Sequence, residues 1–374
     1  MKSFRKILFW LHLISGVVAG IVIFIMCVTG ALLSFEKNIA EYAEREMRLV
    51  AAPNLNAPRL SLEEIWIKVQ AATPETKFSS IALSNDPNAA WQISLGRGGQ
   101  IFVNPYSGEI TGEGAKGIRG FFRTTTDLHR WIALSGDGRP FGKAITGASN
   151  LMFLFLAISG IYIWFPRRRS RKHLRAALTP RWKVTGKARN FNWHTVIGFW
   201  SSLVLIILTL TATVFSYQWT GNLLYTLTGN EVPAQQQAAP NQQSEQSSII
   251  PENLNAVWTK AETQTNWKSI SLRLPIVKDA AIFTIDEGIY WNIFGRSTLT
   301  VNAKTGEVSK WESYGEQNSA RQMRSWFRFT HTGETGGLVG QFIGFLACLG
   351  GAVLVYTGFA LAWRRFRNRH SVKG

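Results

Sequence analysis

The sequence predicts an α-helical polytopic membrane protein with four transmembrane helices and two α+β modules outside the membrane, built by internal tandem duplication. Three observations predict this fold class: four long apolar stretches, an uneven distribution of positive charge, and matching motifs in the two halves of the chain. Without them, a length of 374 residues would be typical of two or three soluble domains.

Four apolar stretches are each long enough to cross a bilayer, which takes about 20 residues of helix. Lys143 is the chief charge within them. The first stretch follows a basic start, but it exceeds the ~7–15 apolar residues of a signal peptide and no A-x-A-like site follows it, so we expect a retained span. The stretches are residues 7–35, 141–165, 193–219 and 338–363.

The net charge of +18 is concentrated in three short segments. Residues 1–6, 166–190 and 364–374 carry three, ten and five Lys and Arg, and none of them contains Asp or Glu. Because basic short loops mark the cytoplasmic side of a membrane protein, we expect both termini and the middle loop inside and the two long connections outside. Basic runs of this kind attract anionic lipid head groups, and their distribution argues against a nucleic-acid-binding protein.

The two halves carry the same series of motifs. In each half a histidine precedes each span, and Ser or Thr followed by Gly or Ala occurs later in the span. The seventeen-residue spacing from His12 to Thr29 recurs from His194 to Thr211. The series is His12, Thr29, His129 and Ser159 in the first half, and His194, Thr211, His331 and Thr357 in the second.

The two external regions also repeat each other. Residues 80–83 (SIAL) recur as 269–272 (SISL), and 103–110 (VNPYSGEI) recur as 301–308 (VNAKTGEV). Each region opens with a predicted helix, the first through a capping box of Ser61 and Glu64 and the second over 252–263. Alternating runs then predict antiparallel strands, and the polar stretch 234–248 predicts a flexible linker. The strands are expected at 78–83, 90–95, 100–104, 269–274, 281–285, 290–294 and 298–302.

A helix followed by hairpins and a closing V-N-x-x-[ST]-G-E motif resembles the PepSY domain. Two such modules between four spans, with H…G…TG and LH…G…G…SG…W…RR signatures, are similar to the PepSY-associated transmembrane family over nearly the whole chain. The resemblance implies a bacterial inner (cytoplasmic) membrane protein with periplasmic modules and a link to iron uptake. Its best understood type is similar to a reductase that carries two b-type haems and acts on ferric siderophores. The matching histidines are His12, His129, His194 and His331.

Topology and resemblance together predict eight segments. They are transmembrane helix 1 (1–36), PepSY-like module 1 (37–128), an interfacial helix with transmembrane helix 2 (129–166), a basic cytoplasmic loop (167–190), transmembrane helix 3 (191–220), a periplasmic linker with PepSY-like module 2 (221–330), an interfacial segment with transmembrane helix 4 (331–365), and a cytoplasmic tail (366–374).

The four histidines are the candidate ligands. Charge topology places His12 and His194 near the cytoplasmic interface and His129 and His331 near the outer one, and a parallel duplication puts equivalent residues at equivalent depth. We therefore expect the pairs His12 with His194 and His129 with His331. Two neutral imidazoles saturate haem iron and give electron transfer rather than oxygen binding.

Other residue types leave alternatives open. A bare metal site needs three or four ligands, for which Asp127 and Glu334 are the possible outer companions. The span glycines either admit a macrocycle or promote helix packing. Outer arginines either pair haem propionates or snorkel at the interface. The two cysteines are expected to act as small hydrophobes. The outer arginines are Arg119, Arg123, Arg130, Arg324 and Arg328, and the cysteines are Cys27 and Cys348. The tryptophans close to the histidines, Trp10, Trp131, Trp193 and Trp326, are candidates for contact with a haem or for an interfacial aromatic belt.

The leading hypothesis is a di-haem b oxidoreductase that passes electrons across the membrane to a periplasmic acceptor, a ferric siderophore or other ferric chelate. The sequence has no dinucleotide fingerprint and no P-loop, so a cytoplasmic flavoprotein or a membrane quinol is expected as electron donor. The alternatives are a non-enzymatic PepSY regulator, resembling proteins regarded as peptidase inhibitors, and a siderophore transport accessory protein or permease. A permease would need polar groups near mid-membrane, where the spans have no ionisable residue.

Overall fold

The computed structural model describes residues 2–54, 57–74, 76–96, 99–165, 171–233, 253–290 and 292–370. The expected linker at 234–248 and the arginines at 167–169 lie outside the described residues. The chain forms two units. The helical unit comprises Met1–Glu36, Phe121–Leu224 and Trp326–Gly374, and the sheet unit comprises Lys37–Gly120 and Tyr225–Ser325.

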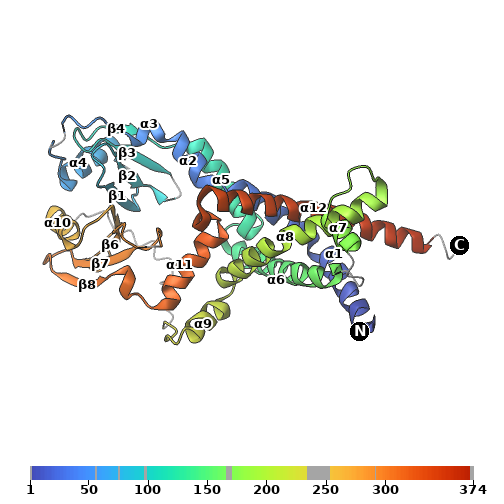
Figure 1. Cartoon of the computed structure of the whole chain (residues 1–374). Coiled ribbons are helices and arrows are strands. Elements are labelled where there is room, and N and C mark those ends of the chain that lie inside the picture. Colours follow the sequence, from blue (N-terminus) through green and yellow to red (C-terminus); the bar gives the residue numbers. More distant parts are fainter. Residues whose placement is uncertain are drawn as a thin grey trace. The chain divides into compact units, whose positions relative to one another are not determined.

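Four long helices form the core of the helical unit (Figure 1). All four are long and apolar enough to cross a membrane, which confirms the four-span prediction. α1 packs against α6 and α12, and α8 packs against the same two helices, so α1 and α8 lie on a diagonal of the bundle. The helices are α1 (Lys2–Leu33), α6 (Arg139–Trp164), α8 (Gly186–Ser216) and α12 (Gly337–His370).

The middle of the bundle is a packed apolar layer. Phe153 of α6 packs against a cluster around Cys27 of α1 and against a second cluster around Leu205 of α8. The helices approach closely here, because a Cβ at Gly351 of α12 would lie 2.6 Å from the Cys27 sulfur. Both cysteines are free thiols, and Cys27 is buried among these apolar side chains. Dispersion contacts and small residues thus hold the spans together.

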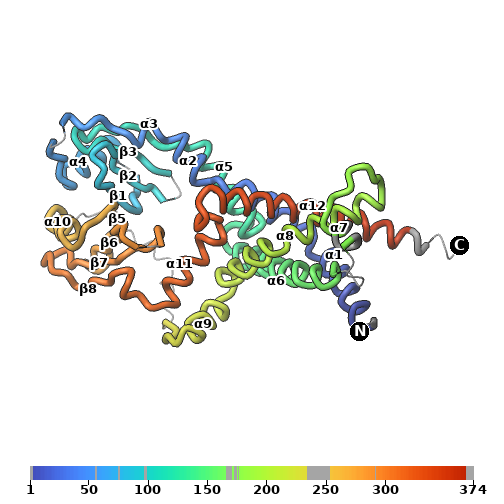
Figure 2. The backbone as a smooth tube through the Cα atoms, in the orientation of Figure 1, coloured from blue at the N-terminus to red at the C-terminus, as the bar shows by residue number. Residues whose placement is uncertain are grey.

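Two shorter helices each precede a span. α5 (Lys116–Trp131) leads to α6, and α11 (Ser319–His331) leads to α12. The backbone trace in Figure 2 follows both helices into the spans. The short 3₁₀ helices η2 (Gly136–Gly138) and η4 (Glu334–Gly336) make the turns. On the other side of the bundle, α7 (Arg171–Leu178) precedes α8, and the indole N–H groups of Trp164 and Trp200 donate to carbonyls of Ala177 and Leu178 at its end.

The sheet unit is built on one eight-stranded antiparallel sheet of order β4-β3-β2-β1-β5-β6-β7-β8. Each predicted module supplies four strands, and α4 and α10 share one core with alternate residues of the strands. The Ser61–Glu64 capping box forms as predicted. The bounds are α4 (Leu62–Ala72), β1 (Ser80–Ser84), β2 (Trp91–Ser94), β3 (Gln100–Val103), β4 (Ile110–Gly112), α10 (Leu254–Gln264), β5 (Ser269–Arg273), β6 (Ala280–Asp286), β7 (Ser297–Asn302) and β8 (Val308–Glu312).

The two modules join through equivalent residues. β1 pairs with β5 in a register centred on Ala82 and Ser271, which occupy the same place in the two repeats. The backbone N–H of Glu63 donates to the Asn255 side chain, and the N–H of Asn255 donates to the Glu63 carboxylate. Joining the modules removes two exposed strand edges, which would otherwise be sites for aggregation.

Three details of the sheet differ from the sequence expectation. The predicted strand at 290–294 is wrong: its described residues form a turn, in which the Asn292 side chain accepts from the N–H of Phe294. The fourth strand of each module was not predicted. β4 is only three residues long, and the first residues of β8 are exposed, so neither carries the buried–exposed alternation that predicts a strand.

The remaining elements are short helices. α2 (Glu36–Ala43) and α3 (Arg45–Arg48) follow α1, and α9 (Gln218–Leu227) follows α8. η3 (Tyr314–Glu316) lies between β8 and α11.

Candidate functional site

Each of the four histidines bonds to a hydroxyl of another helix through Nδ1. The Nδ1 of His12 on α1 lies 2.8 Å from Oγ of Ser159 on α6. The Nδ1 of His194 on α8 lies 2.9 Å from Oγ1 of Thr357 on α12. Both bonds join the first span of a half to the second span of the same half. The sequence presented these hydroxyls only as repeat markers and did not identify them as partners of the imidazoles.

The other two histidines end the short helices and bond back to the first span of their half. The Nδ1 of His129 at the end of α5 lies 2.8 Å from Oγ1 of Thr29 on α1. The Nδ1 of His331 at the end of α11 lies 3.2 Å from Oγ1 of Thr211 and 2.9 Å from the carbonyl oxygen of Leu208, both on α8. All four hydrogen bonds therefore follow one pattern in both halves.

These bonds determine which imidazole nitrogen is free. The Leu208 carbonyl only accepts, so Nδ1 of His331 carries the proton. The Thr29 hydroxyl donates to the carbonyl of Ile25 at 2.6 Å, and its oxygen is left to accept from His129. The Thr357 hydroxyl likewise donates to Val353 at 2.8 Å. A neutral imidazole protonated at Nδ1 presents a lone pair at Nε2, the nitrogen with no hydrogen bond to the described residues in any of the four histidines.

The histidines lie at two levels of the bundle. His12 and Thr29 belong to one continuous helix, and seventeen residues at 1.5 Å each separate them by about 25 Å along its axis. Because Thr29 bonds to His129, the levels of His12 and His129 are separated by a similar distance. The same relation holds on α8 between His194 and Thr211, the partner of His331. The hydrocarbon core of a bilayer is about 30 Å thick, so the two levels fall near its two faces.

The members of each level lie near one another. The ring centroids of His129 and His331 are 6.5 Å apart. Two imidazoles bound through Nε2 to opposite sides of one metal ion have centroids about 6 Å apart, at about 2 Å per metal–nitrogen bond and about 1 Å from nitrogen to ring centre. At the other level, His194 lies within electrostatic range of His12, and the two residues project from the diagonal helices α1 and α8.

Three glycines beside the hydroxyls make room for the imidazoles. A Cβ built on Gly30 would lie 3.4 Å from Cε1 of His129, and one on Gly160 or Gly358 would lie 3.5 Å from Cε1 of His12 or His194. The fourth equivalent position is Ala212, so a methyl group is accepted beside His331. Each Thr-Gly or Ser-Gly pair therefore forms a cradle for one imidazole: the hydroxyl binds Nδ1, and the glycine leaves space for the ring.

Several arginines and tryptophans named in the sequence analysis make ion pairs or cation–π contacts. The Arg119 guanidinium binds the Glu44 carboxylate, so it is neither a free propionate partner nor a snorkelling side chain. Arg130 and Arg139 both stack on Trp131, at 4.7 and 4.5 Å from the ring. Near the other level, Arg365 stacks on Trp10 and Arg189 on Trp193. The remaining outer arginine with a described ring contact is Arg328, over Phe329.

Two buried polar atoms, one in Trp193 and one in Arg139, have no hydrogen-bond partner among the described residues. One is the indole nitrogen of Trp193, adjacent in sequence to His194, and the other is Nε of Arg139, which stacks on Trp131 near His129. A buried donor without a partner is costly, and a propionate or another acceptor at either place would satisfy it. The donor set and these two atoms fit a bis-histidine group at each level.

A bare metal site finds no support among the described residues. Within them, no three His, Cys, Asp or Glu side chains come together as a metal-binding group. Glu334, the first residue of η4, accepts from the Thr332 hydroxyl at 2.8 Å. Two imidazoles per level suit a cofactor that supplies the other ligands of its own metal.

The comparison with known families agrees with this architecture. The model of the PepSY-associated TM region matches residues 9–365. The chain belongs to this family. The match includes all four spans, both external regions and the four histidines, and it confirms the resemblance recognised in the sequence. A comparison with curated proteins gave no match.

Proposed function

We propose that this PepSY-associated membrane protein is a di-haem b oxidoreductase that carries electrons between the two faces of the membrane. The observation that carries the proposal is the common state of the four histidines: Nδ1 of each is bonded to a Ser or Thr hydroxyl, and Nε2 is left for a ligand. His12 with His194 would hold one haem, and His129 with His331 the other. The haems would supply one-electron transfer without oxygen binding.

The chain's own residues then perform binding and orientation. The hydroxyls fix the direction of each imidazole, the glycines leave room for it, and the Trp193 indole and Arg139 guanidinium are donors for acidic edges of the cofactor. The apolar layer around Phe153 excludes water and ions between the levels. This packed middle layer also supports electron transfer over a permease function.

The basic segments and the repeat give the proposal its direction. We propose that both termini and the 166–190 loop are cytoplasmic, that the sheet unit is periplasmic, and that the chain arose by tandem duplication. The β1–β5 register centred on equivalent residues, and the corresponding histidine bonds, support the duplication. Electrons would enter at the His12/His194 level from a flavoprotein or quinol and leave from the His129/His331 level.

The proposed acceptor is a ferric siderophore or ferric chelate. Hard oxygen chelators bind Fe(II) far more weakly than Fe(III), so one electron delivered to the bound iron releases it. The acceptor is reduced by outer-sphere transfer, and no nucleophile or general acid is required at the outer level. The assignment of acceptor follows from the family's link to iron uptake.

The experiment is an absorption spectrum of the protein purified in detergent from haem-replete cells. We expect two b-type haems per chain in the wild type and one in each of His12→Ala and His129→Ala. His173→Ala, in the basic loop, is the matched control and should retain both. A colourless wild type rejects the proposal in favour of a PepSY regulator, and full haem content in both variants rejects the pairing. Dithionite-reduced protein should then reduce ferric chelates, detected with a ferrous-iron indicator.

A further inference from the structure

The four imidazole partners are alike in position but not in chemistry. Three are threonines and one, Ser159, is a serine. The threonine hydroxyls hold their own protons in short bonds to helix carbonyls: Thr29 to Ile25 at 2.6 Å, Thr357 to Val353 at 2.8 Å, and Thr211 to Ile207 at 2.8 Å. The Ser159 hydroxyl lies 3.4 Å from the nearest such carbonyl, that of Leu156.

The difference determines what each hydroxyl can do for its histidine. A hydroxyl whose proton is used by its own helix only accepts, so it holds Nδ1–H and keeps Nε2 unprotonated. A β-branched threonine is also stiff about χ1, which fixes the oxygen in place. Serine rotates more freely, and its long bond to Leu156 leaves its proton available. Ser159 can therefore either accept from or donate to Nδ1 of His12, and the tautomer of His12 is not fixed by its partner.

An acceptor on Nδ1–H also changes the strength of the ligand. It orients the ring and raises the basicity of Nε2, and such partners tune metal sites nearly as much as the ligands themselves. A more basic axial ligand favours the oxidised iron and so lowers the reduction potential. The hydroxyl partners can therefore set the reduction potential of each level separately, because each hydroxyl contacts one of the four imidazoles.

We infer that Thr29, Thr357 and Thr211, the last together with the Leu208 carbonyl, are positioning residues that lock their histidines with Nε2 as the ligand atom, and that Ser159 makes His12 the adjustable ligand of the four. The inference rests on the proposed function and adds to it a means of setting the two levels to different potentials. The inner level, His12 and His194, combines one adjustable and one locked imidazole. The outer level, His129 and His331, combines two locked imidazoles.

The test is a redox titration followed by absorption, with the two haems resolved in single-level backgrounds. In His129→Ala, which retains the inner haem, Thr357→Val should raise the midpoint potential and Ser159→Thr should lower it. In His12→Ala, which retains the outer haem, Thr29→Val should raise the potential, whereas Thr357→Val should leave it unchanged. Thr357→Ser keeps a hydroxyl that can accept from Nδ1, so it should shift the potential less than Thr357→Val does.

The matched control is Thr195→Val. Thr195 follows His194 on the same helix, and among the described residues its hydroxyl bonds only to carbonyls of its own helix, so the potential should not move. Two-haem protein whose potentials do not respond to Thr357→Val or Thr29→Val overturns this inference and leaves the proposed function standing. If one of these variants fails to fold, the other decides, since they probe different levels. A colourless wild type overturns the proposed function and this inference together.

Discussion

The two halves of the chain hold the helices that end at His129 and His331 in corresponding but physically different ways. Arg119 lies ten residues before His129 in the first turn of α5, and Arg321 lies ten residues before His331 in the first turn of α11. Arg119 binds Glu44, whose side chain is 0 % exposed, whereas Arg321 binds Glu312, whose side chain is 23 % exposed. One half uses a buried charge at this point, and the other uses a solvated one.

The buried anchor is a fully satisfied carboxylate. Besides Arg119, Glu44 accepts from Arg48 at 2.9 Å, from the Gln100 amide at 2.7 Å and from the N–H of Ala115 at 3.1 Å. Burial raises the pKa of Glu44, but the hydrogen bonds from Arg119, Ala115 and Arg48 outweigh it and hold the pKa at about 2. The charge is therefore retained at every physiological pH.

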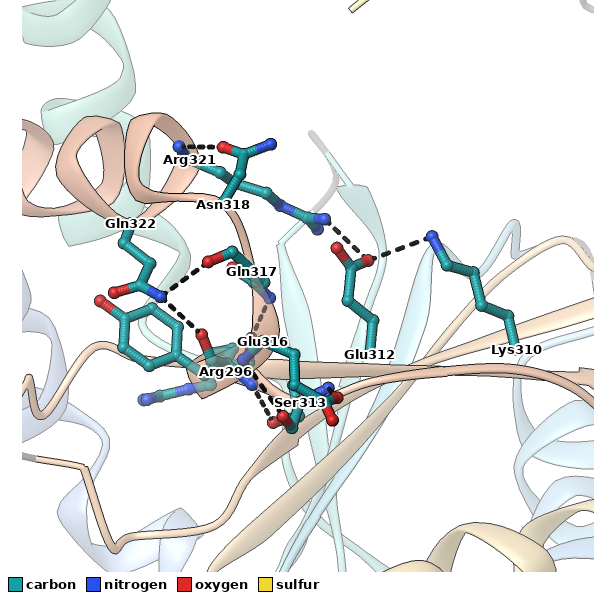
Figure 3. A network of polar contacts seen from close by, with 11 residues as sticks. Arg296, Lys310, Glu312, Ser313, Glu316, Gln317, Asn318, Arg321 and Gln322 are labelled. Atoms are coloured by element: carbon teal, nitrogen blue, oxygen red, sulfur yellow. Dashed lines mark hydrogen bonds and ion pairs between the residues drawn. The ribbon is translucent and has the colours of Figure 1, made fainter. Parts of the chain in front are cut away.

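The second anchor, Glu312, is accompanied by several hydrogen bonds to backbone groups (Figure 3). Glu312 receives Arg321 at 2.9 Å and Lys310 at 3.4 Å, and Ser313 with Glu316 forms a capping box beside it. The Gln322 amide donates to the carbonyls of Tyr314 and Gln317. The starts of the two equivalent helices are thus held by one buried ion cluster in the first half and by several weaker bonds in the second. We expect the two anchors to differ in their sensitivity to mutation.

The largest expected effect is the loss of the buried anchor. Glu44→Gln leaves the Arg119 and Arg48 charges without a counter-ion, so we expect a loss of about 3 kcal/mol in the free energy of unfolding. Glu312→Gln is the matched control and should cost less than about 1 kcal/mol, as exposed pairs do. Thermal unfolding of the two full-length variants in the same detergent measures both. Equal losses would mean that burial does not distinguish the two anchors.

The pH dependence should follow the same residue. Because the pKa of Glu44 is lowered in the folded state, its contribution is fully present above its ordinary pKa and is lost as pH falls toward about 2. The wild type should lose stability relative to Glu44→Gln between about pH 5 and pH 2. Parallel unfolding curves of both proteins over this range would contradict the assignment.

The turns that follow His129 and His331 also differ between the two halves. In the second half Gly333 has φ 79°, and a Cβ there would lie 2.8 Å from Cα of Gln341. In the first half Ile132 and Ala133 take φ 53° and 57°, so ordinary side chains occupy the left-handed region. Gly333→Ala should therefore destabilise by about 2 kcal/mol, whereas Ala133→Gly, at an exposed position, should stabilise by about 1 kcal/mol. Melting temperatures moving in the same direction for both would contradict this reading of the turns.

The smallest expected effect concerns the ring cradles. Gly30→Ala brings a methyl group to 3.3 Å from the Cys348 sulfur and 3.4 Å from Cε1 of His129, so these neighbours must yield by a few tenths of an ångström. Ala212→Gly removes the corresponding methyl group in the other half. Each exchange should cost less than about 1 kcal/mol, and only the spectrum of the proposed haem at His129 and His331 should change. A change in the spectrum of the haem proposed at His12 and His194 would contradict the placement of Gly30 beside His129.

Local signals in the sequence were sufficient for the elements. Hydrophobic length predicts the four spans, alternation predicts most strands, and Ser61 with Glu64 predicts the start of α4. These features are properties of short segments, so one chain shows them without its fold. The strand expected at 290–294 failed because an apolar aromatic run has the composition of a strand, while the Asn292 side chain closes it into a turn.

The sequence also singled out the four histidines and the hydroxyls that turned out to bind them. The signal for Thr29 and Thr211 was the repeated seventeen-residue spacing from His12 and His194, and Ser159 and Thr357 were marked by the repeated SG and TG pairs; none of these patterns identified a partner. Arg119 was assigned to the membrane interface or to propionates because its neighbours are aromatic and basic. Its true partner, Glu44, lies 75 residues away, and no local pattern reveals a contact at that separation.

By itself, then, the sequence determined a four-span membrane protein of repeated plan, its charged and apolar faces, and the residue types available as ligands, since these depend on composition and short-range periodicity. Only the tertiary structure decided that β1 and β5 join the modules into one sheet, that each Nδ1 binds a hydroxyl across a helix interface, and that Ser159 differs from the three threonines. The reason is that such bonds depend on the distance and direction between atoms of different helices, which packing sets.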